Sequence, residues 1–424
     1  MTRRIAGVIV NTVPYHHARW EAMARSCSTE VHLVEMTSRD EFKVLEFSES
    51  STYLRHTLLN AREDKKMPPC ELVRRMSAEL DEIKPNVICV SGWGLRVSLA
   101  AMRWALLNRV PIVMLSESNE FDEVRSTIKE WMKSRLVGLC SAGLVGGTPQ
   151  ADYLVKLGLP RTSVFVGYDV VDNDFFGVRV NELKESGVRS QKSGGGCSKQ
   201  YFFACARFGK KKNIPGLIRA YALYRKLTKH SSESSASAFS LGLPGRCSAS
   251  VTEPSDFDLV IAGEGEQRTE IERVISECGV KDHVQLVGAK GYQELPAYYA
   301  GAAVFIHAST TEQWGLVVNE AMASGLPVLV SNRCGCAGDL VREGENGFTF
   351  DPYNEEQLAD LMVRIASDEV ARCQMGARSR EIIAEWGPDR FASGMNAAVT
   401  VALAADNKKA GFIDRSVLNF VLSR

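Results

Sequence analysis

The chain has 424 residues, with 51 basic and 51 acidic side chains and a formal net charge of zero. This length exceeds one ordinary core and predicts two domains, and the balanced charge excludes the basic footprint of a nucleic-acid-binding protein. Hydrophobic residues make up 45% and charged residues 24%, which excludes general disorder.

Cysteine usage and the N-terminal segment bear on the cellular compartment. The chain has 11 cysteines, and the close pair Cys334 and Cys336 is spaced too tightly for an ordinary zinc knuckle, so we expect mostly reduced thiols and a cytoplasmic location. The opening MTRRIAGVIVN has too short an apolar run for a secretory leader and predicts a first strand. Because no stretch reaches about 18 uninterrupted apolar residues, any membrane association would be peripheral, on the inner face of a membrane.

Residues 1–185 are expected to form an N-terminal lobe. Short apolar runs alternate there with longer amphipathic segments, a pattern typical of a parallel sheet covered by helices. The expected strands are residues 5–10, 31–34, 87–90, 112–115, 144–146 and 164–166. Together they predict one doubly wound α/β domain.

A Gly/Ser/Lys-rich stretch at residues 186–199, SGVRSQKSGGGCSK, is the predicted interlobe linker. A second series of strands and helices fills residues 200–387, beginning at YFFACA, with a polar low-complexity insertion at residues 231–256. Its further strands are expected at residues 259–262, 284–286, 304–306, 328–330 and 348–350. Residues 388–424 are predicted to form a last helix, with Pro388 at its first position, and a tail.

The most informative segment is HASTTEQWGLVVNEAMASGLPVLVS, residues 307–331. A helix that opens there leaves its first backbone N–H groups without intrahelical partners, and such groups can bind a diphosphate. The groups belong to Gly315, Leu316 and Val317. Glu320, further along the helix, is placed to accept hydrogen bonds from two ribose hydroxyls, and Glu312 on the preceding loop can reach hydroxyls of a transferred sugar. The simpler alternative makes both glutamates ordinary solvated residues.

This segment resembles the Glu-x7-Glu signature of glycosyltransferase family 4, including the Glu-x-x-Gly opening and the sequel Glu-Ala-Met-Ala-Ser-Gly-Leu-Pro-Val. The resemblance implies a GT-B fold, in which two Rossmann-like doubly wound lobes face each other across a cleft, with the acceptor on the N-terminal lobe. It also implies a retaining, metal-independent hexosyltransferase that moves a sugar from a UDP- or GDP-linked donor to a hydroxyl acceptor, in polysaccharide or glycolipid synthesis. No further cofactor is implied.

The resemblance extends over most of the second lobe. ACARFGKKKN, residues 204–213, is similar to the family's Gly-Arg-x-x-x-x-Lys segment, which makes Arg207 and Lys212 the pair that grips the donor phosphates. An Arg fork and a flexible ammonium can neutralise charge on a departing diphosphate, although a Lys run is more often a solvated face. The turn IAGEGE, with Gly263 and Gly265, is similar to the family's Gly-x-Gly or is a packing turn. The family binds the nucleobase against the main chain after a later strand, which here ends at Gly288.

GYDVVDNDFF, residues 167–176, resembles the family segment that closes the first lobe. Its Asp172 and Asp174 have the Asp-x-Asp spacing that serves as a metal motif in another large glycosyltransferase class, and Asp256 and Asp258 repeat it. Neither pair ends a predicted strand, and cations with a helix terminus already serve the phosphates. We therefore expect no metal site.

The first lobe departs from the family in the loop after the predicted strand 112–115. The family places a His in this loop, whereas this chain reads SESNEFDEVR. Glu117, Asn119 or Glu120 can take over contact with the donor sugar, or can serve as helix-capping or solvated residues.

Two further loops follow predicted strands at the same edge. NTVPYHHARW places His16 and His17 after the first strand, where either can bind the acceptor or assist proton transfer, or can be a structural residue with its hydrogen bonds satisfied. Trp93 follows the strand at residues 87–90 and can stack on a sugar ring or join the core.

The helix predicted at residues 126–137, STIKEWMKSRLV, is expected to place Ile128, Trp131, Met132 and Leu136 on one face. It fits an acidic membrane surface and a lipid-linked acceptor, or it is an ordinary helix packed on its sheet, which is the simpler interpretation. Two other functions share the architecture. A nucleotide-sugar epimerase would convert its donor without an acceptor, and a non-catalytic nucleotide-sugar-binding protein would not convert it at all.

Overall fold

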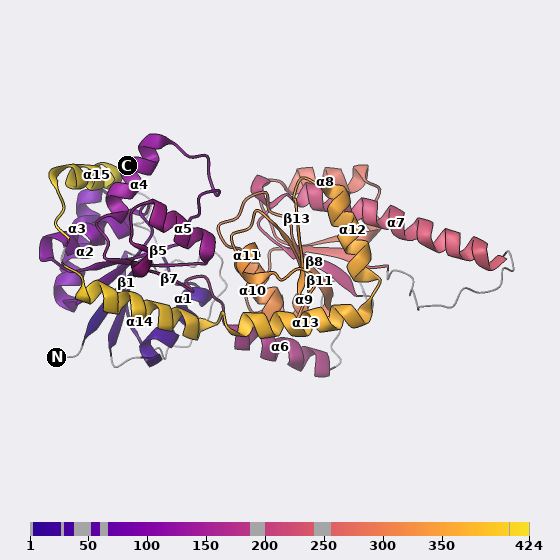
Figure 1. Cartoon of the computed structure of the whole chain (residues 1–424), viewed down its shortest axis with the longest axis horizontal. Coiled ribbons are helices and arrows are strands. Elements are labelled where there is room, and N and C mark those ends of the chain that lie inside the picture. The colour runs from indigo at the N-terminus through magenta and orange to yellow at the C-terminus, as the bar shows by residue number, and fades with distance from the viewer. Residues whose placement is uncertain are drawn as a thin grey trace. The chain divides into compact units, whose positions relative to one another are not determined.

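The computed structural model describes residues 3–26, 29–37, 52–59, 67–186, 200–240, 256–406 and 408–423. The chain forms two compact units (Figure 1). The first comprises Met1–Asp172 and Trp386–Arg424, so both termini belong to it, and the second comprises Asn173–Glu385.

The first unit contains a parallel sheet of seven strands in the order β3-β2-β1-β4-β5-β6-β7. The strands are β1 (Arg4–Ile9), β2 (Glu30–Thr37), β3 (Leu54–Leu59), β4 (Val87–Ser91), β5 (Ile112–Ser116), β6 (Ala142–Val145) and β7 (Val164–Val166). In the centre of the sheet, Gly7 lies opposite both Leu33 and Cys89. The six expected strands are present, and β3 is an additional edge strand that the sequence analysis missed. Its sequence, LRHTLL, lacks a continuous apolar run because most of the strand is not buried.

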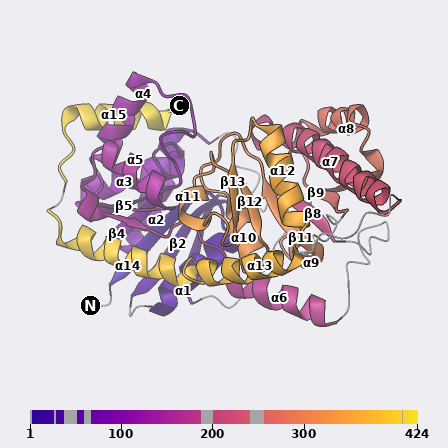
Figure 2. The ribbon, with the colours of Figure 1, turned by 45° about the vertical axis from the view of Figure 1, so that its right-hand side comes forward.

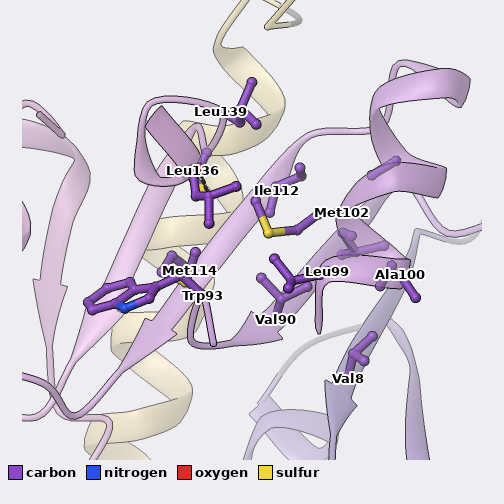
Figure 3. Close-up of a cluster of buried hydrophobic side chains, with 14 of the residues drawn as sticks. Val8, Val90, Trp93, Leu99, Ala100, Met102, Ile112, Met114, Leu136 and Leu139 are labelled. Atoms are coloured by element: carbon purple, nitrogen blue, oxygen red, sulfur yellow. Dashed lines mark hydrogen bonds between the residues drawn. The ribbon is translucent and has the colours of Figure 1, made fainter. Parts of the chain in front are cut away.

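Helices cover both faces of this sheet. They are α1 (Pro14–Ser26), α2 (Pro69–Ile83), α3 (Arg96–Asn108), α4 (Thr127–Val137), α5 (Thr148–Lys156), α14 (Pro388–Ala404) and α15 (Phe412–Ser423). Alternate strand residues face opposite layers: Ile5 packs with Trp20 of α1 and Phe391 of α14, whereas Val8 belongs to the cluster with α2, α3, α4, α5 and α15. Figure 3 shows part of that second cluster, with Val8 and Met102 of α3 among its labelled side chains.

The second unit contains a parallel sheet of six strands in the order β10-β9-β8-β11-β12-β13. The strands are β8 (Tyr201–Cys205), β9 (Asp258–Ala262), β10 (Val284–Gly288), β11 (Ala302–His307), β12 (Val328–Ser331) and β13 (Gly347–Phe350). All six were expected. Most residues are buried in five of these strands, whereas only Val284 is buried in β10.

Helices also cover both faces of the second sheet. They are α6 (Asn173–Glu185), α7 (Ile214–Ser240), α8 (Arg268–Glu277), α9 (Leu295–Gly301), α10 (Leu316–Ala323), α11 (Ala337–Leu340), α12 (Glu355–Ala366) and α13 (Glu369–Ala384), with short 3₁₀ turns at η3 (Lys210–Lys212) and η4 (Lys281–His283). α7 and α12 lie side by side over one face, where they share a core with α8 (Figure 2). α6, α9, α10 and α13 pack with one another on the other face.

The predicted boundary between the units is wrong. The segment 173–185, assigned to the first lobe from sequence, forms α6 and belongs to the second unit. Phe175 stacks on Tyr292 with ring centroids 4.6 Å apart, and Phe176 contacts Tyr299 edge-on at 5.8 Å. The second unit ends at Glu385 instead of 387. The predicted linker 186–199 lies almost wholly outside the described residues.

The insertion predicted at residues 231–256 also differs. α7 continues through Ser240, so the first ten residues of the predicted insertion are helical, and residues 241–255 lie outside the described residues. The predicted last helix is confirmed as α14, with Pro388 in its first turn. The tail forms a further helix, α15, which packs against α3 and α4.

Candidate active site

The strand order of the second sheet reverses between β8 and β11. Doubly wound sheets bind ligands at such a reversal, beyond the carboxyl ends of the strands. Three predicted site residues lie there: Arg207 follows β8, Lys212 ends the turn η3, and Glu312 lies on the loop after β11. A backbone hydrogen bond from Thr310 N to Lys211 O, 2.8 Å long, joins the two loops. Segments about a hundred residues apart in sequence are thus held together.

Lys212 and Glu312 form an ion pair in which the side chains are 17% and 12% exposed. Glu312 Oε2 also lies 3.4 Å from His307 Nε2 and accepts a hydrogen bond from Ser309 Oγ at 3.3 Å. The sequence analysis did not single out His307. Its position at a carboxyl strand end, five residues before a candidate glutamate, was the available signal.

These neighbours keep Glu312 ionised. Burial acts to raise the pKa of Glu312, but the hydrogen bond and charge interaction with His307 and the ammonium of Lys212 outweigh it and hold the pKa well below its usual range. Burial lowers the pKa of His307, and Glu312 acts against that decrease. An ionised carboxylate only accepts hydrogen bonds. Glu312 is therefore suited to bind a donor group such as a sugar hydroxyl.

The Gly-x-Gly turn packs directly against the loop that carries Arg207. Gly263 has φ +153°, and a Cβ there would lie 1.9 Å from Ala206 O. Gly265 also has φ +153°, and its Cβ would lie 2.8 Å from Phe208 O. The packing interpretation therefore accounts for both glycines. A contact with the donor stays a prediction for this turn.

Two further residues predicted for the donor site, Gly288 and Arg207, lie beside this turn. Gly288 ends β10 with φ +77°, and its carbonyl accepts a hydrogen bond from Gly263 N at 2.9 Å. The side chain of Arg207 is exposed and forms no hydrogen bond or ion pair with the described residues. Its guanidinium is therefore available to an anion.

The helix α10 begins beside Glu312. Gly315 is its N-cap with φ +109°, and a Cβ there would lie 3.5 Å from His307 Nε2. That contact would be an ordinary one, so the positive φ is what favours glycine at this position. Leu316 and Val317 are half-buried, so the first turn of the helix is only partly covered. Their amides carry the partial positive charge of a helix N-terminus, which favours an anion.

Glu320 lies in the second turn of α10 and is fully buried. Its Oε2 accepts a hydrogen bond from the hydroxyl of Tyr299 at 2.7 Å. This bond fixes the orientation of the carboxylate. The solvated alternative for Glu320 is wrong, and contact with a ribose stays a prediction.

The two candidate histidines of the first unit have local partners. His16 Nδ1 lies 3.0 Å from Asn11 O, and His17 Nδ1 lies 3.0 Å from the hydroxyl of Tyr53. Burial lowers the pKa of both imidazoles; with a further contribution from Arg19, that of His16 falls to about 4. His16 is therefore neutral at pH 7.

Trp93 lies in the core of the first unit. Of its two predicted roles, stacking on a sugar ring or packing in the core, the structure supports packing in the core. Its side chain is 9% exposed. It meets Tyr153 edge-on at a centroid distance of 6.1 Å and lies 5.8 Å from the ammonium of Lys133.

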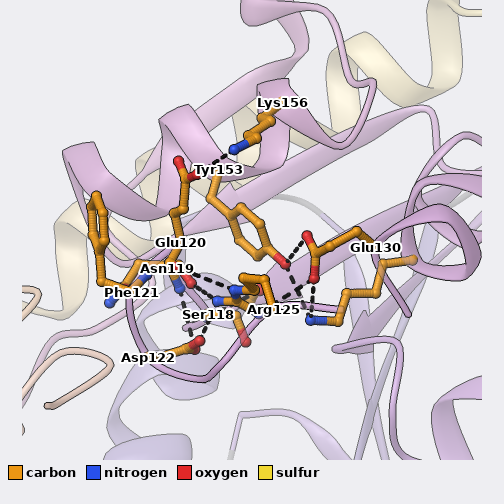
Figure 4. A network of polar contacts seen from close by, with 11 residues as sticks. Ser118, Asn119, Glu120, Phe121, Asp122, Arg125, Glu130, Tyr153 and Lys156 are labelled. Carbon is orange, nitrogen blue, oxygen red and sulfur yellow. Dashed lines mark hydrogen bonds and ion pairs between the residues drawn. The ribbon is translucent and has the colours of Figure 1, made fainter. Parts of the chain in front are cut away.

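Figure 4 shows two of the three candidates in the loop after β5, Asn119 and Glu120. Asn119 is buried, and its Oδ1 accepts a hydrogen bond from Phe121 N at 2.8 Å, which shapes the loop. Glu120 forms an ion pair with Lys156 of α5. Both residues thus have structural partners, whereas the loop places Glu117 nearest to the sheet edge, beside a buried carboxyl group.

That carboxyl group is Asp169, which follows β7 and is fully buried. Arg19 of α1 lies 3.6 Å from it, stacks over Tyr168 at 4.8 Å and donates to Val170 O at 3.1 Å. Burial raises the pKa of Asp169 well above its usual range; the charge and a hydrogen bond of Glu117 add to this effect, and Arg19 opposes it. Loss of the proton from this buried carboxyl group is therefore less favourable than from an exposed aspartic acid. The sequence analysis missed the cluster because three distant segments form it.

The side chains around the Asp-x-Asp pairs bear on whether either pair has further metal ligands. Within the described part of the chain, no three His, Cys, Asp or Glu side chains are grouped so that they could hold a metal ion. Asp256 forms an ion pair with Arg225, and Asp258 lies 3.1 Å from His283. Both carboxylates therefore have side-chain partners.

The side chains predicted to form one apolar face of α4 differ in burial. Ile128 is 70% and Trp131 50% exposed, whereas Leu136 is buried in the core. Among the helices of the described residues, none is both long and apolar enough to cross a bilayer.

Solved structures share the fold over nearly the whole length of the chain. Sucrose-phosphate synthase from Thermosynechococcus elongatus has a TM-score of 0.67 at 17% identity, over 95% of this chain and 99% of that one. Anabaena HepE, solved in complex with UDP, has a TM-score of 0.65 at 15% identity, over 94% and 99%. The chain therefore has the GT-B fold of glycosyltransferases.

Residues 190–382, which lie within the second unit, match the family model of glycosyl transferases group 1. The GDP-mannose-dependent alpha-(1-6)-phosphatidylinositol monomannoside mannosyltransferase of Mycobacterium tuberculosis is 34% identical over 143 residues, 32% of this chain and 37% of that protein. The alpha-D-kanosaminyltransferase of Streptomyces kanamyceticus is 28% identical over 120 residues, 28% of this chain and 31% of that protein. The matches thus span about a third of each relative.

Proposed function

We propose that this protein is a retaining glycosyltransferase that moves a sugar from a UDP- or GDP-linked donor to a hydroxyl acceptor without a metal ion. One observation carries the proposal: Lys212, Glu312 and the start of α10 meet at the carboxyl edge of the sheet, where the strand order reverses between β8 and β11. The segment that matches glycosyl transferases group 1 contains all three. One relative is named for GDP-mannose and one structural neighbour was solved with UDP, so both bases are candidates.

The donor diphosphate would bind between two sources of positive charge. Arg207 and Lys212 supply full charges, and the amides of Leu316 and Val317 supply the partial charge of the helix N-terminus. Their effect on rate is greatest as the diphosphate departs, because its negative charge grows at that step. Glu312 would accept hydrogen bonds from hydroxyls of the transferred sugar.

The remaining donor contacts follow from the same placement. Glu320, oriented by Tyr299, would accept hydrogen bonds from the ribose, and the backbone at Gly288 and in the turn of Gly263 and Gly265 would line the nucleobase and phosphates. Glycine at these positions lets a ligand approach the main chain closely.

Retention requires the acceptor hydroxyl to attack from the face that the diphosphate leaves. The departing phosphate oxygen can take the acceptor's proton, so the carbon–oxygen bond to the sugar forms as the bond to the diphosphate breaks. The protein then contributes positioning and charge stabilisation. A dedicated protein base is not required, and His16, His17 or Glu117 would orient the acceptor.

Two finer proposals concern location and role. We place the protein in the cytoplasm, at the inner face of a membrane, in polysaccharide or glycolipid synthesis. The exposed Ile128 and Trp131, with Lys129 between them, form the surface of α4 that would rest on anionic lipid. Cosedimentation with anionic vesicles, lost in the double variant Ile128→Ser/Trp131→Ser, tests this contact.

Nucleotide binding tests the donor site first. UDP and GDP are titrated into the purified chain and its thermal stability is followed, since a ligand at about 100 times its Kd adds roughly 2.7 kcal/mol. We expect a shift with one nucleotide, reduced in Lys212→Met but unchanged in Lys210→Met, which alters an exposed lysine of the same turn. An absence of any shift would refute the donor site.

Turnover measurements distinguish a transferase from an epimerase and from a non-catalytic binding protein. A transferase releases nucleotide only as it transfers a sugar to an acceptor or to water, whereas an epimerase converts the nucleotide sugar with no acceptor. A binding protein would show the stability shift and no turnover with any donor.

A further inference from the structure

The first unit has its own cavity at the equivalent point of its sheet. Its strand order reverses between β1 and β4, and a cavity of about 290 Å³ lies at the carboxyl ends of the strands there. Val10 follows β1, Met36 lies near the end of β2, and Leu59 ends β3; all three line it. Ligands of doubly wound sheets bind at this kind of position.

The lining of this cavity is apolar. Leu72 in the first turn of α2 and Val97 in the first turn of α3 close two of its sides, and both are buried. Gly94 and Leu95 are exposed, so they mark its mouth. Its volume is at the lower end of the roughly 300–1,000 Å³ of small-molecule sites. A chain of methylene groups suits such walls better than a sugar ring, whose hydroxyls would find few partners.

One end of the cavity is positively charged. Arg96 is the only charged residue in the described part of the lining, and it is also the first residue of α3. Its Nη2 donates to Met67 O at 2.7 Å, which holds the guanidinium beside the cavity. The helix has 13 residues and no side-chain cap at its N-terminus, so its dipole adds partial positive charge at the same place.

We propose that this cavity binds the acceptor, and that the acceptor is an anionic amphiphile. Its alkyl or prenyl chain occupies the apolar cavity, and a phosphate that joins the chain to the hydroxyl-bearing part lies beside Arg96. This proposal rests on the proposed function, because it assigns the acceptor of that reaction. It excludes a free oligosaccharide as the acceptor, since such a molecule would leave the apolar walls in water.

The position of Gly94 allows a matched pair of variants. A Cβ at Gly94 meets no atom within 4 Å, and its φ lies outside the left-handed region. Gly94→Ala therefore changes the backbone preference and leaves the cavity open. Gly94→Phe changes the backbone in the same way but places a ring in the mouth.

Octyl phosphate, octyl glucoside and inorganic phosphate serve as probes, each titrated calorimetrically into the chain below micelle-forming concentrations. We expect octyl phosphate to bind the wild type and Gly94→Ala with Kd values within threefold, and Gly94→Phe at least tenfold more weakly. Octyl glucoside should bind the wild type more weakly than octyl phosphate does. Arg96→Gln should reduce this difference in affinity between the two amphiphiles. Equal binding to the two Gly94 variants would overturn the proposal, and so would tighter binding of the glucoside.

Nucleotide titrations on the same samples separate this proposal from the proposed function. Gly94→Phe should keep the affinity of the wild type for UDP or GDP, and Lys212→Met should keep the affinity for octyl phosphate. If nucleotide binds and octyl phosphate does not, the acceptor proposal fails alone. If octyl phosphate binds at the cavity and no nucleotide binds, the proposed function fails.

Discussion

Removal of the ammonium of Lys212 tests the electrostatics of the donor site without any ligand. In Lys212→Met the carboxylate of Glu312, which is 12% exposed, loses its cationic partner and keeps the neighbouring His307 and Ser309. Methionine is similar in length to lysine, so the apolar stem is largely retained. The variant therefore isolates the charge.

The expected loss of stability follows from how far the ion pair of Lys212 and Glu312 is buried. An exposed ion pair contributes about 0–1 kcal/mol, and removal of one partner of a fully buried pair costs about 3–5 kcal/mol. With side chains 17% and 12% exposed, we expect Lys212→Met to destabilise the second unit by about 2–3 kcal/mol. In a unit of roughly 200 residues this corresponds to a decrease in Tm of about 4–12 °C.

Thermal unfolding at several pH values is the assay. The pKa of Glu312 in the folded chain lies below its usual range, so the pair stabilises the fold above the unfolded value of about 4.3, and this contribution is lost as the pH falls toward the folded value. The difference between wild type and Lys212→Met should therefore be full at pH 7 and shrink below about pH 4. The double variant Lys212→Met/Glu312→Gln should be more stable than Lys212→Met alone.

Two results would refute this reasoning. One is a Lys212→Met variant as stable at pH 7 as the control Lys210→Met, which alters an exposed lysine of the same turn and should change stability by less than about 0.5 kcal/mol. The other is a stability difference that is independent of pH between 7 and 3.

Three further predictions concern positions outside that pair. Gly263→Ala should destabilise the chain by more than about 2 kcal/mol, because its Cβ would lie 1.9 Å from a backbone oxygen at φ +153°, whereas Gly209→Ala, with open space, should not; equal Tm values would contradict this. The imidazole of His16 should titrate near pH 4 by NMR. Its pKa is lower in the folded chain than in the unfolded chain, so the free energy of unfolding should decrease as the pH is lowered from about 6.5 to 4. A titration near the ordinary value of about 6.5 would contradict this prediction. Arg19→Met should lower the free energy of unfolding by about 3–5 kcal/mol, and Arg19→Met/Asp169→Leu should lower it by less. Urea unfolding measures both values. A double variant less stable than Arg19→Met would exclude the buried pair.

Much of the fold was predictable because buried parallel strands need continuous apolar runs. β4 and β12 are examples, since nearly all of their residues are buried and turn residues bound them. The donor-site residues were predictable because their spacing lies within short segments. Gly315, for instance, has a positive φ that its position before a helix already favoured.

Other features depend on contacts between distant segments, which a single sequence does not encode in any local pattern. The assignment of α6 to the second unit depends on Phe175 and Phe176 packing on α9 and the turn before it. The cluster of Arg19, Asp169 and Glu117 joins α1 with the ends of β7 and β5. The edge strand β3 has too few buried residues to show a period.

Transfer to water tests the central claim most directly, because it needs no knowledge of the acceptor. The chain is incubated with UDP- and GDP-linked α-hexoses, nucleotide release is measured, and proton NMR identifies the first anomer of the freed sugar. The account predicts release from one donor class, a first product with the α configuration of the donor, and a turnover about 100- to 1,000-fold lower in Lys212→Met but unchanged in Lys210→Met. A β product, or equal turnover in the two lysine variants, would contradict it.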